Sequence, residues 1–300
     1  MGLEEGHGGR VVGVLAGRAA LITGANRGLG LEIARAYLAE GASLFLCARD
    51  GDLLKRAVEG LRVEYPGGQT QFATGDVSCE ADVERVTRLA LERFPQLDIL
   101  VNNAGVYGPM GLLEDVDWRA WTEAMAINVY GSVLMIRGLL PHLKARGYGK
   151  IIQLSGGGAT NPLPRISAYA ASKAAIVRLI ETVAEECRTD GIDANSIAPG
   201  ALNTGMLSEV LAAGPQAVGE DFYERAIKQE ASGGAGPSKG AALAVFLASR
   251  ASDGVTGRLI SALWDRYEAW PGQREALDKS DAYTLRRIIG RDRGLEWGDR

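Results

Sequence analysis

Short apolar runs alternate with amphipathic stretches along most of this chain. Seven runs have the length of strands: Ala19–Thr23, Ser43–Ala48, Thr70–Thr74, Ile99–Asn102, 150–155, 193–198 and 258–262. Several of them are apolar without alternation, the pattern of strands covered on both faces. Between the runs, two sets of apolar residues recur at every fourth position, as on one helix face: Leu29, Ile33 and Tyr37, and Trp121, Met125, Val129 and Val133. The alternation predicts an α/β fold, a doubly wound parallel sheet of about seven strands with helices on both faces.

No internal repeat or domain boundary stands out. Residues 232–239 (SGGAGPSK) have the composition of a linker, but a further helix and strand are predicted after them, so we interpret them as a loop within one domain. The first ten residues are glycine-rich and polar, and we expect residues 1–14 to form a flexible tail before a domain spanning 15–262. Residues 263–300 are then a C-terminal extension, packed on the same domain or on a neighbouring subunit.

Composition and charge argue against several classes of protein. Apolar residues make up 46% of the 300 residues and charged residues 23%, which is typical of globular proteins and not of disordered or fibrous ones. A net charge of -4 disfavours a nucleic-acid partner, since phosphates require a basic surface. The three cysteines lack C-x-x-C spacing and only two histidines are present, so we expect neither a metal site nor a disulfide framework.

The apolar stretches also bear on location. The longest of them are interrupted by Gly, Arg or Asp before the ~20 residues that a membrane-spanning helix needs. The early run 11–16 is too short for the core of a signal peptide. We therefore expect a cytoplasmic protein with no membrane partner.

The first candidate for chemistry is the run TGANRGLG at 23–30, which follows a predicted strand and opens a predicted helix. Glycines let the backbone turn sharply and approach a pyrophosphate, whose charge is stabilised by free N–H groups and the helix dipole. An ordinary glycine-rich turn is the alternative, but the strand-to-helix context favours dinucleotide binding. The candidate binding residues are Gly24, Asn26, Arg27, Gly28, Leu29 and Gly30.

The end of the next predicted strand bears on the choice of dinucleotide. An acidic residue there would accept hydrogen bonds from the adenosine ribose, whereas an arginine favours a 2'-phosphate. Ala48 and Arg49 stand at this place, and Arg27 in the glycine loop could add a second cation. NADP(H) is therefore favoured over NAD(H). The alternative is that Arg49 is merely solvated and that Asp50 binds the ribose.

A third candidate is the run YAASK at 169–173, at the start of a predicted helix. The i, i+4 spacing places the Tyr169 phenol and the Lys173 ammonium on one helix face. A free tyrosine, with a pKa near ~10, is a poor acid–base group at neutral pH, and a neighbouring cation favours its phenolate. The pair can thus move a proton, although this spacing also occurs by chance on amphipathic helices.

Six motifs follow one another in a fixed order: TGANRGLG (23–30), GDV (75–77), NNAG (102–105), INVYG (127–131), YAASK (169–173) and PGALNTGM (199–206). In this order the chain resembles the short-chain dehydrogenase/reductase family, in its compact single-domain branch, over about 15–262. The resemblance implies a Rossmann-like fold. It also implies hydride transfer between NADP(H) and a small carbonyl or secondary alcohol substrate, with Tyr169 supplying or removing the proton.

The resemblance assigns roles to residues around the dinucleotide. Asp76 and Val77 would hold the adenine, and Lys173 would bind the nicotinamide ribose while lowering the pKa of Tyr169. Asn128 would hold a water in a proton relay behind Lys173. A helix cap for Asp76 and simple helix packing for Asn128 are the alternative interpretations.

Two further groups take their roles from the same resemblance. The adenosine side would be lined, and the central sheet supported, by Asn103, Ala104 and Gly105. The nicotinamide carboxamide would be oriented by residues of one later loop: Pro199, Gly200, Leu202 and Thr204. A Pro-Gly pair that only ends a strand is the alternative for that loop.

One position departs from the pattern of the family. Where the family has a serine that hydrogen-bonds the substrate oxygen, this chain has Gly156, and Ser155 stands one residue early. The glycines that follow could let Ser155 move into place, so Ser155 is our candidate for the role. Thr160 or a backbone N–H could polarise the carbonyl instead, or no group fills the role and catalysis is weak.

The parts of the sequence that could contact a substrate carry less information about function. Residues 201–239, which would close over the substrate, identify no ligand. The extension 263–300 holds three of the five tryptophans and a basic cluster of Arg286, Arg287, Arg291 and Arg293. It could cover a substrate cleft, or form a solvated charged tail with aromatic anchors. Because its acidic residues nearly balance the basic ones, we favour the tail.

Partners and alternative functions also come from the resemblance. It implies a homodimer or homotetramer, in which the helices around 121–146 and 168–189 pack against a second copy. A 3-oxoacyl thioester reductase would share all of these motifs. Because of Gly156, a catalytically silent NADP-binding regulator is the alternative from another class.

Overall fold

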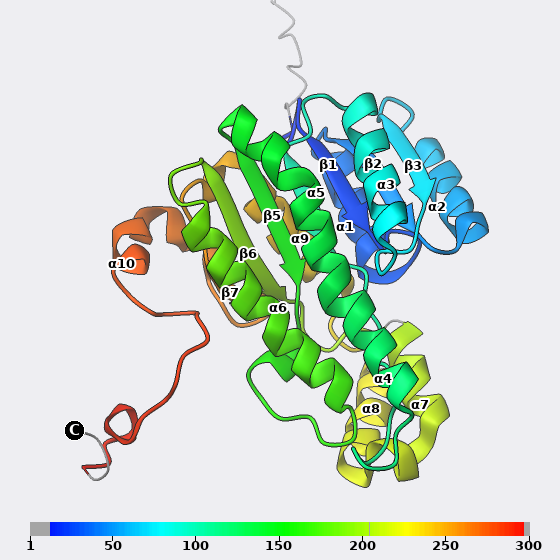
Figure 1. Ribbon diagram of the computed structural model, residues 1–300, viewed down its shortest axis with the longest axis vertical. Helices are drawn as coiled ribbons and strands as arrows, with labels where there is room; N and C mark the ends of the chain where they lie inside the picture. Colours follow the sequence, from blue (N-terminus) through cyan, green and yellow to red (C-terminus); the bar gives the residue numbers. More distant parts are fainter. Residues whose placement is uncertain (1–12, 204, 297–300) are drawn as a thin grey trace, which may run out of the picture.

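Seven parallel strands form one sheet in the order β3-β2-β1-β4-β5-β6-β7 in the computed structural model, which describes residues 13–203 and 205–296 (Figure 1). The strands are β1 (Ala19–Thr23), β2 (Ser43–Ala48), β3 (Thr70–Thr74), β4 (Ile99–Asn102), β5 (Gly149–Leu154), β6 (Ile192–Ala198) and β7 (Leu259–Ser261). All seven predicted strands are present, and only the ends of the last three differ, by one residue. This order and the crossover helices confirm the predicted Rossmann-like fold.

Helices cover both faces of the sheet and create two cores. In β1, Ala20 and Ile22 face one core while Ala19 and Leu21 face the other, which explains why the strand is apolar without alternation. The first core contains α1 (Gly28–Ala39), α2 (Gly51–Glu64) and α9 (Pro237–Ala248). The second contains α3 (Glu80–Arg93), α5 (Gly131–Arg146) and α6 (Ser167–Glu186).

A single long helix runs through α4 (Trp118–Met125), the π-helical turn η1 (Ala126–Tyr130) and α5. By length and composition alone, Trp118–Arg146 could cross a membrane. The interruptions noted in the sequence are present in this helix, at Gly131 and Arg137. Its apolar character has another cause here, because Met135, Leu139 and Leu143 are buried in the second core. The predicted stripe from Trp121 to Val133 is only partly buried.

Two helices, α7 (Gly205–Val218) and α8 (Glu220–Ser232), stand beyond the carboxyl ends of the strands (Figure 1). They pack on each other through a small cluster of their own, formed by Leu207, Val210, Val218 and Ala226. That residues 201–239 close over a substrate stays a prediction. The segment 232–239 connects α8 to α9 and lies within the domain.

The first part of the C-terminal extension packs on the domain. It contains η4 (Tyr267–Gln273) and α10 (Arg274–Asp278), and it contributes Tyr267, Trp270 and Leu277 to the first core. Buried Arg258 donates hydrogen bonds to three main-chain carbonyls of this part, those of Leu277, Ser280 and Ala282. The later part, with the short turn η5 (Gly290–Arg293), leaves the body of the domain (Figure 1). Residues 1–12, which hold most of the predicted N-terminal tail, lie outside the described residues.

Candidate active site

A cleft of about 680 Å³ opens at the carboxyl ends of the strands and reaches α7 and α8. Most of the predicted site residues line it: Gly24, Asn26, Arg27, Gly28, Leu29, Arg49, Val77, Asn103, Ala104, Gly105, Ser155, Tyr169, Lys173, Pro199, Gly200 and Leu202. Gly30, Asp76 and Asn128 are not among its lining residues, and Thr204 lies outside the described residues. Residues 263–296 of the extension do not line this cleft.

The glycine loop turns as a dinucleotide site requires. Gly24 and Gly28 have φ values of 62° and 58°, in the left-handed region that favours glycine. No side chain among the described residues caps the first turn of α1, so its N–H groups remain free to bind an anion. This uncapped helix end, opening on the cleft, fits the pyrophosphate of a dinucleotide.

Gly30 and Asn103 support the glycine loop. A Cβ at position 30 would lie 2.4 Å from Asn103 Nδ2, so only glycine allows this contact. Asn103 Nδ2 in turn donates to the main-chain oxygens of Thr23 and Gly24, at 3.0 Å each. Thr23 Oγ1 accepts from the backbone N–H groups of Asn103 and Ala104. These residues therefore hold the loop against the end of β4, as the support role of Asn103 requires.

The end of the cleft that is predicted to bind the adenosine carries two arginines. Both Arg27 and Arg49 line the cleft, and the Arg49 side chain is 52% exposed. Arg49 Nη1 lies 3.7 Å from Asp76 Oδ2 and 4.0 Å from Glu123 Oε1. The carboxylate of Asp50, the alternative ribose ligand, accepts a hydrogen bond of 2.8 Å from Leu53 N and caps α2.

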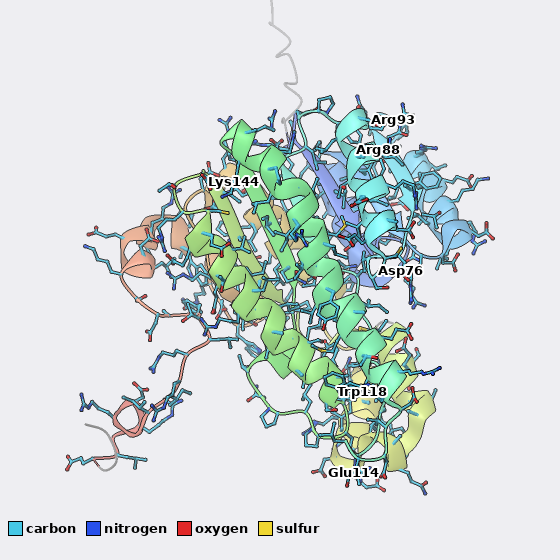
Figure 2. All side chains as sticks on the ribbon, viewed as in Figure 1. Asp76, Arg88, Arg93, Glu114, Trp118 and Lys144 are labelled. Carbon is cyan, nitrogen blue, oxygen red and sulfur yellow. The ribbon has the colours of Figure 1, made fainter. Side chains whose placement is uncertain are left out.

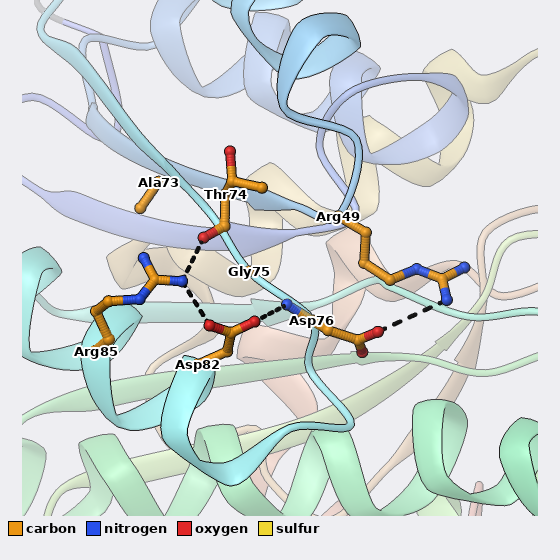
Figure 3. A pocket seen from close by; sticks show the side chains of 7 residues that line it. All are labelled: Arg49, Ala73, Thr74, Gly75, Asp76, Asp82 and Arg85. Carbon is orange, nitrogen blue, oxygen red and sulfur yellow. Dashed lines mark hydrogen bonds and ion pairs between the residues drawn. The ribbon is translucent and has the colours of Figure 1, made fainter.

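A second hollow adjoins this end of the cleft (Figure 3). Arg85 donates from one wall to the main-chain oxygen of Thr74 and to Asp82, and Asp82 accepts from the backbone N–H of Asp76. The bonds from Asp76 and Arg85 lower the pKa of the Asp82 carboxyl. Asp76, two residues after β3 (Figure 2), accepts from the N–H and hydroxyl of Ser78 in the turn before α3. The N-cap residue of α3 is Cys79, so the side chain of Asp76 does not have the helix-cap role offered as an alternative.

Tyr169 and Lys173 lie together on α6. Lys173 Nζ is 5.4 Å from the centre of the Tyr169 ring and donates to the main-chain oxygen of Leu154 at 3.0 Å. Burial lowers the pKa of Lys173 to about 8. Burial, and to a smaller extent Tyr107, raise the pKa of Tyr169 well above its usual value. The resemblance implies that Lys173 lowers this pKa, whereas burial raises it in this structure and favours the neutral phenol.

Asn128 lies within the π-helical turn, a distortion common at functional sites. Its Nδ2 donates to the main-chain oxygen of Val106 at 2.8 Å and to Ser172 Oγ at 2.9 Å, and its Oδ1 accepts from Val106 N at 2.9 Å. The side chain is buried and ties the segment after β4 to α6. These contacts are those expected of helix packing, and the water-holding role that the resemblance implies for Asn128 stays a prediction.

The end of β5 has an unusual geometry. Ser155 is 4% exposed, and its hydroxyl donates to the main-chain oxygen of Lys173 at 3.4 Å. A Cβ at position 156 would lie 2.7 Å from the Tyr169 hydroxyl oxygen. Thr160, one alternative donor, is exposed and does not line the cleft.

Several residues that line the cleft were not predicted from the sequence. Tyr107 lines the cleft, and its ring centre lies 4.7 Å from that of Tyr169. Three polar side chains on α7 and α8 also line it, namely Glu209, Arg225 and Gln229. The only signal for Tyr107 was its place two residues after the NNAG motif, and the polar residues of 201–239 carried no periodic signal.

Comparison with known proteins decides the family. The short chain dehydrogenase model matches residues 18–214. This chain belongs to that family. Among its relatives, D-beta-hydroxybutyrate dehydrogenase of Cupriavidus necator is 33% identical over 87% of this chain and 100% of the relative. L-fucose dehydrogenase of Oryctolagus cuniculus is 34% identical over 79% of this chain and 81% of the relative.

Solved structures agree with this assignment. Levodione reductase superposes with a TM-score of 0.76 at 28% identity, over 87% of this chain and 99% of that one. A putative NAD(P) dependent gluconate 5-dehydrogenase from Beutenbergia cavernae, solved with bound NADP, gives 0.73 at 28% identity, over 86% and 98%. This short-chain dehydrogenase is therefore an oxidoreductase that acts on CH–OH or C=O groups of small molecules with NAD(P).

Proposed function

We propose that this protein is an NADP(H)-dependent oxidoreductase that interconverts a carbonyl compound and a secondary alcohol, with Tyr169 as its acid–base residue. One observation carries the proposal: the Tyr169 phenol opens onto the same cleft as Gly24 and Gly28 of the dinucleotide loop. NADP(H) supplies or takes up the hydride when bound. The side chains of this protein supply the other functions that the reaction needs.

Tyr169 is held in the protonated state that carbonyl reduction needs. Because burial raises the pKa of its phenol, Tyr169 can donate a proton to the substrate oxygen as that oxygen becomes negative. Lys173, with a pKa of about 8, is a cation at neutral pH and would attract both the developing charge and the ribose hydroxyls. Asn128 keeps the segment after β4 in place against α6.

The preference for NADP(H) is supported by the adenosine end of the cleft. Arg27 and Arg49 both line it, and guanidinium groups match phosphate geometry. Asp50 is engaged as a helix cap and is not free to hold a ribose. A 2'-phosphate would compete with Asp76 for Arg49.

A homodimer or homotetramer is part of the proposal. Trp118 and Tyr130, on the helix through α4 and η1, are 69% and 58% exposed, and the stripe from Trp121 to Val133 is only partly buried. An apolar helix face of this kind favours contact with a second copy. Light scattering coupled to size-exclusion chromatography would measure the mass in solution, and a monomer would contradict this part.

The function is tested by turnover of NADPH with a panel of ketones, hydroxy-acid and sugar carbonyls, and 3-oxoacyl thioesters. Tyr169→Phe keeps the ring but removes the proton, so activity should collapse while NADPH still binds. Preference for acyl thioesters would favour the thioester reductase. NADPH binding without any turnover of the wild-type protein would instead favour the silent regulator.

A further inference from the structure

Tyr107 stands beside Tyr169 at the reacting end of the cleft. The two ring centres are 4.7 Å apart and the ring planes are tilted by 57°. Tyr107 comes directly after Val106, whose N–H and carbonyl are both hydrogen-bonded by buried Asn128. A buried side chain thus fixes the backbone that presents Tyr107 to the cleft.

The hydroxyl groups at this end of the cleft differ in whether they are free to donate a hydrogen bond to a substrate. Ser155 spends its hydroxyl hydrogen on the main-chain oxygen of Lys173 and is buried. Neither the Tyr107 nor the Tyr169 hydroxyl has a hydrogen-bond partner among the described residues. Neither one belongs to the fully buried unsatisfied atoms, so both remain reachable from the cleft. Tyr107 therefore presents the second available hydroxyl at this place.

We propose that the Tyr107 hydroxyl donates a hydrogen bond to the substrate carbonyl oxygen, beside the proton donor Tyr169. This inference rests on the proposed function and adds a catalytic residue to it. When the carbonyl carbon takes up hydride from NADPH, the C=O π bond breaks and its electron pair moves to the oxygen. The proton of Tyr169 then completes the alcohol, leaving NADP⁺ and a phenolate that solvent reprotonates. Tyr107 keeps its own proton throughout and stabilises the negative oxygen.

The surroundings of Tyr107 suit a donor that does not ionise. Burial and the nearby carboxylate of Glu209 raise the pKa of its phenol above the usual value. Tyr107 is therefore protonated at neutral pH and can donate a hydrogen bond. The pKa of Tyr169 is raised as well, so Tyr169 is assigned as the proton donor because of its place beside Lys173 and not because of a difference in pKa. Gly156 lacks a side chain that could place a hydroxyl here, and Thr160 does not line the cleft.

The test is Tyr107→Phe, which removes the hydroxyl and keeps the ring that packs on Tyr169. Losing one such donor should lower kcat by about 10²–10³-fold while the Kd for NADPH is unchanged. Tyr283→Phe is the matched control, because Tyr283 is 42% exposed and does not line the cleft. Its kcat should equal that of the wild-type protein.

Tyr107→His separates hydrogen bonding from packing, because histidine retains a ring N–H donor. It should keep clearly more turnover than Tyr107→Phe. The proposal is overturned if Tyr107→Phe stays within about twofold of an active wild-type enzyme, or if the Phe and His variants are equally impaired. A wild-type protein that binds NADPH but turns over no carbonyl overturns the proposed function itself, a result readily told apart from the other two.

Discussion

The Tyr169 hydroxyl lies against the position of a side chain at residue 156, since a Cβ there would lie 2.7 Å from its oxygen and would require that hydroxyl to shift. Gly156 itself is fully extended, with a φ of 173°, so its backbone would accept any residue. The constraint is therefore the phenol and not the backbone. A serine at this position would collide with the proton donor before it could assist it.

Gly156→Ala is accordingly expected to lower kcat by about 10²-fold, because displacement of a reacting group by around 1 Å costs that much. Gly156→Ser should also lower activity, although the resemblance to the family suggests that a serine would restore it. Gly157→Ala is the control, since a Cβ there meets nothing within 4 Å. Steady-state kinetics of the three variants decide the matter, and equal kcat values for the two alanine variants would contradict the prediction.

Ser155→Ala should leave kcat within about threefold of the wild-type value, because its hydroxyl is committed to the Lys173 carbonyl. The loss of that buried hydrogen bond should instead lower the free energy of unfolding by about 1 kcal/mol. Kinetics and urea unfolding measure the two effects. A fall in kcat of about 10²–10³-fold would show instead that Ser155 contacts the substrate oxygen.

Lys173→Met should abolish turnover and yet stabilise the protein measured without cofactor. The pKa of Lys173 is lowered from 10.5 to about 8, so burying its charge costs on the order of 3 kcal/mol at neutral pH. Between pH 8 and 10.5 the unfolded chain binds the extra proton, so the free energy of unfolding of the wild-type protein rises with pH there. Urea unfolding of both proteins at neutral pH and near pH 10 should show the gap closing. A gap independent of pH would count against a buried ammonium.

Arg49→Ala should weaken NADPH binding by about 10–100-fold, the effect of losing one charge-assisted hydrogen bond, and should change NADH binding little. Arg88→Ala is a suitable control, since Arg88 is 60% exposed on α3 and pairs with Glu92 (Figure 2). Calorimetric titration with both dinucleotides gives the affinities. Equal affinity of the wild-type protein for NADH and NADPH would remove the basis of the prediction.

The strands could be predicted because burial on both faces leaves an unbroken apolar run, as β1 illustrates. The glycine loop and the Tyr169–Lys173 pair could also be predicted, because the chemistry of each depends on residues that are close together along the chain. Tyr107 was not, because a lone aromatic residue in a loop has no periodicity and its neighbour Tyr169 is far away in sequence. The pKa of Tyr169 was misjudged for a related reason: burial depends on the whole fold, while Lys173 is only four residues away.

Because the buried guanidinium of Arg258 bonds to the C-terminal extension, the chain cannot be shortened by removing that extension without cost. Strand β7 lies at the end of the sheet, and Leu259 N donates to the main-chain oxygen of Tyr283, so the extension covers an otherwise open edge. A chain cut after Ala262 would lose that cover, the three acceptors of Arg258 and the side chains of Tyr267 and Trp270 together. Such a fragment would expose the unpaired edge of β7 together with apolar surface of the first core, so it should be recovered as aggregate rather than as a smaller enzyme.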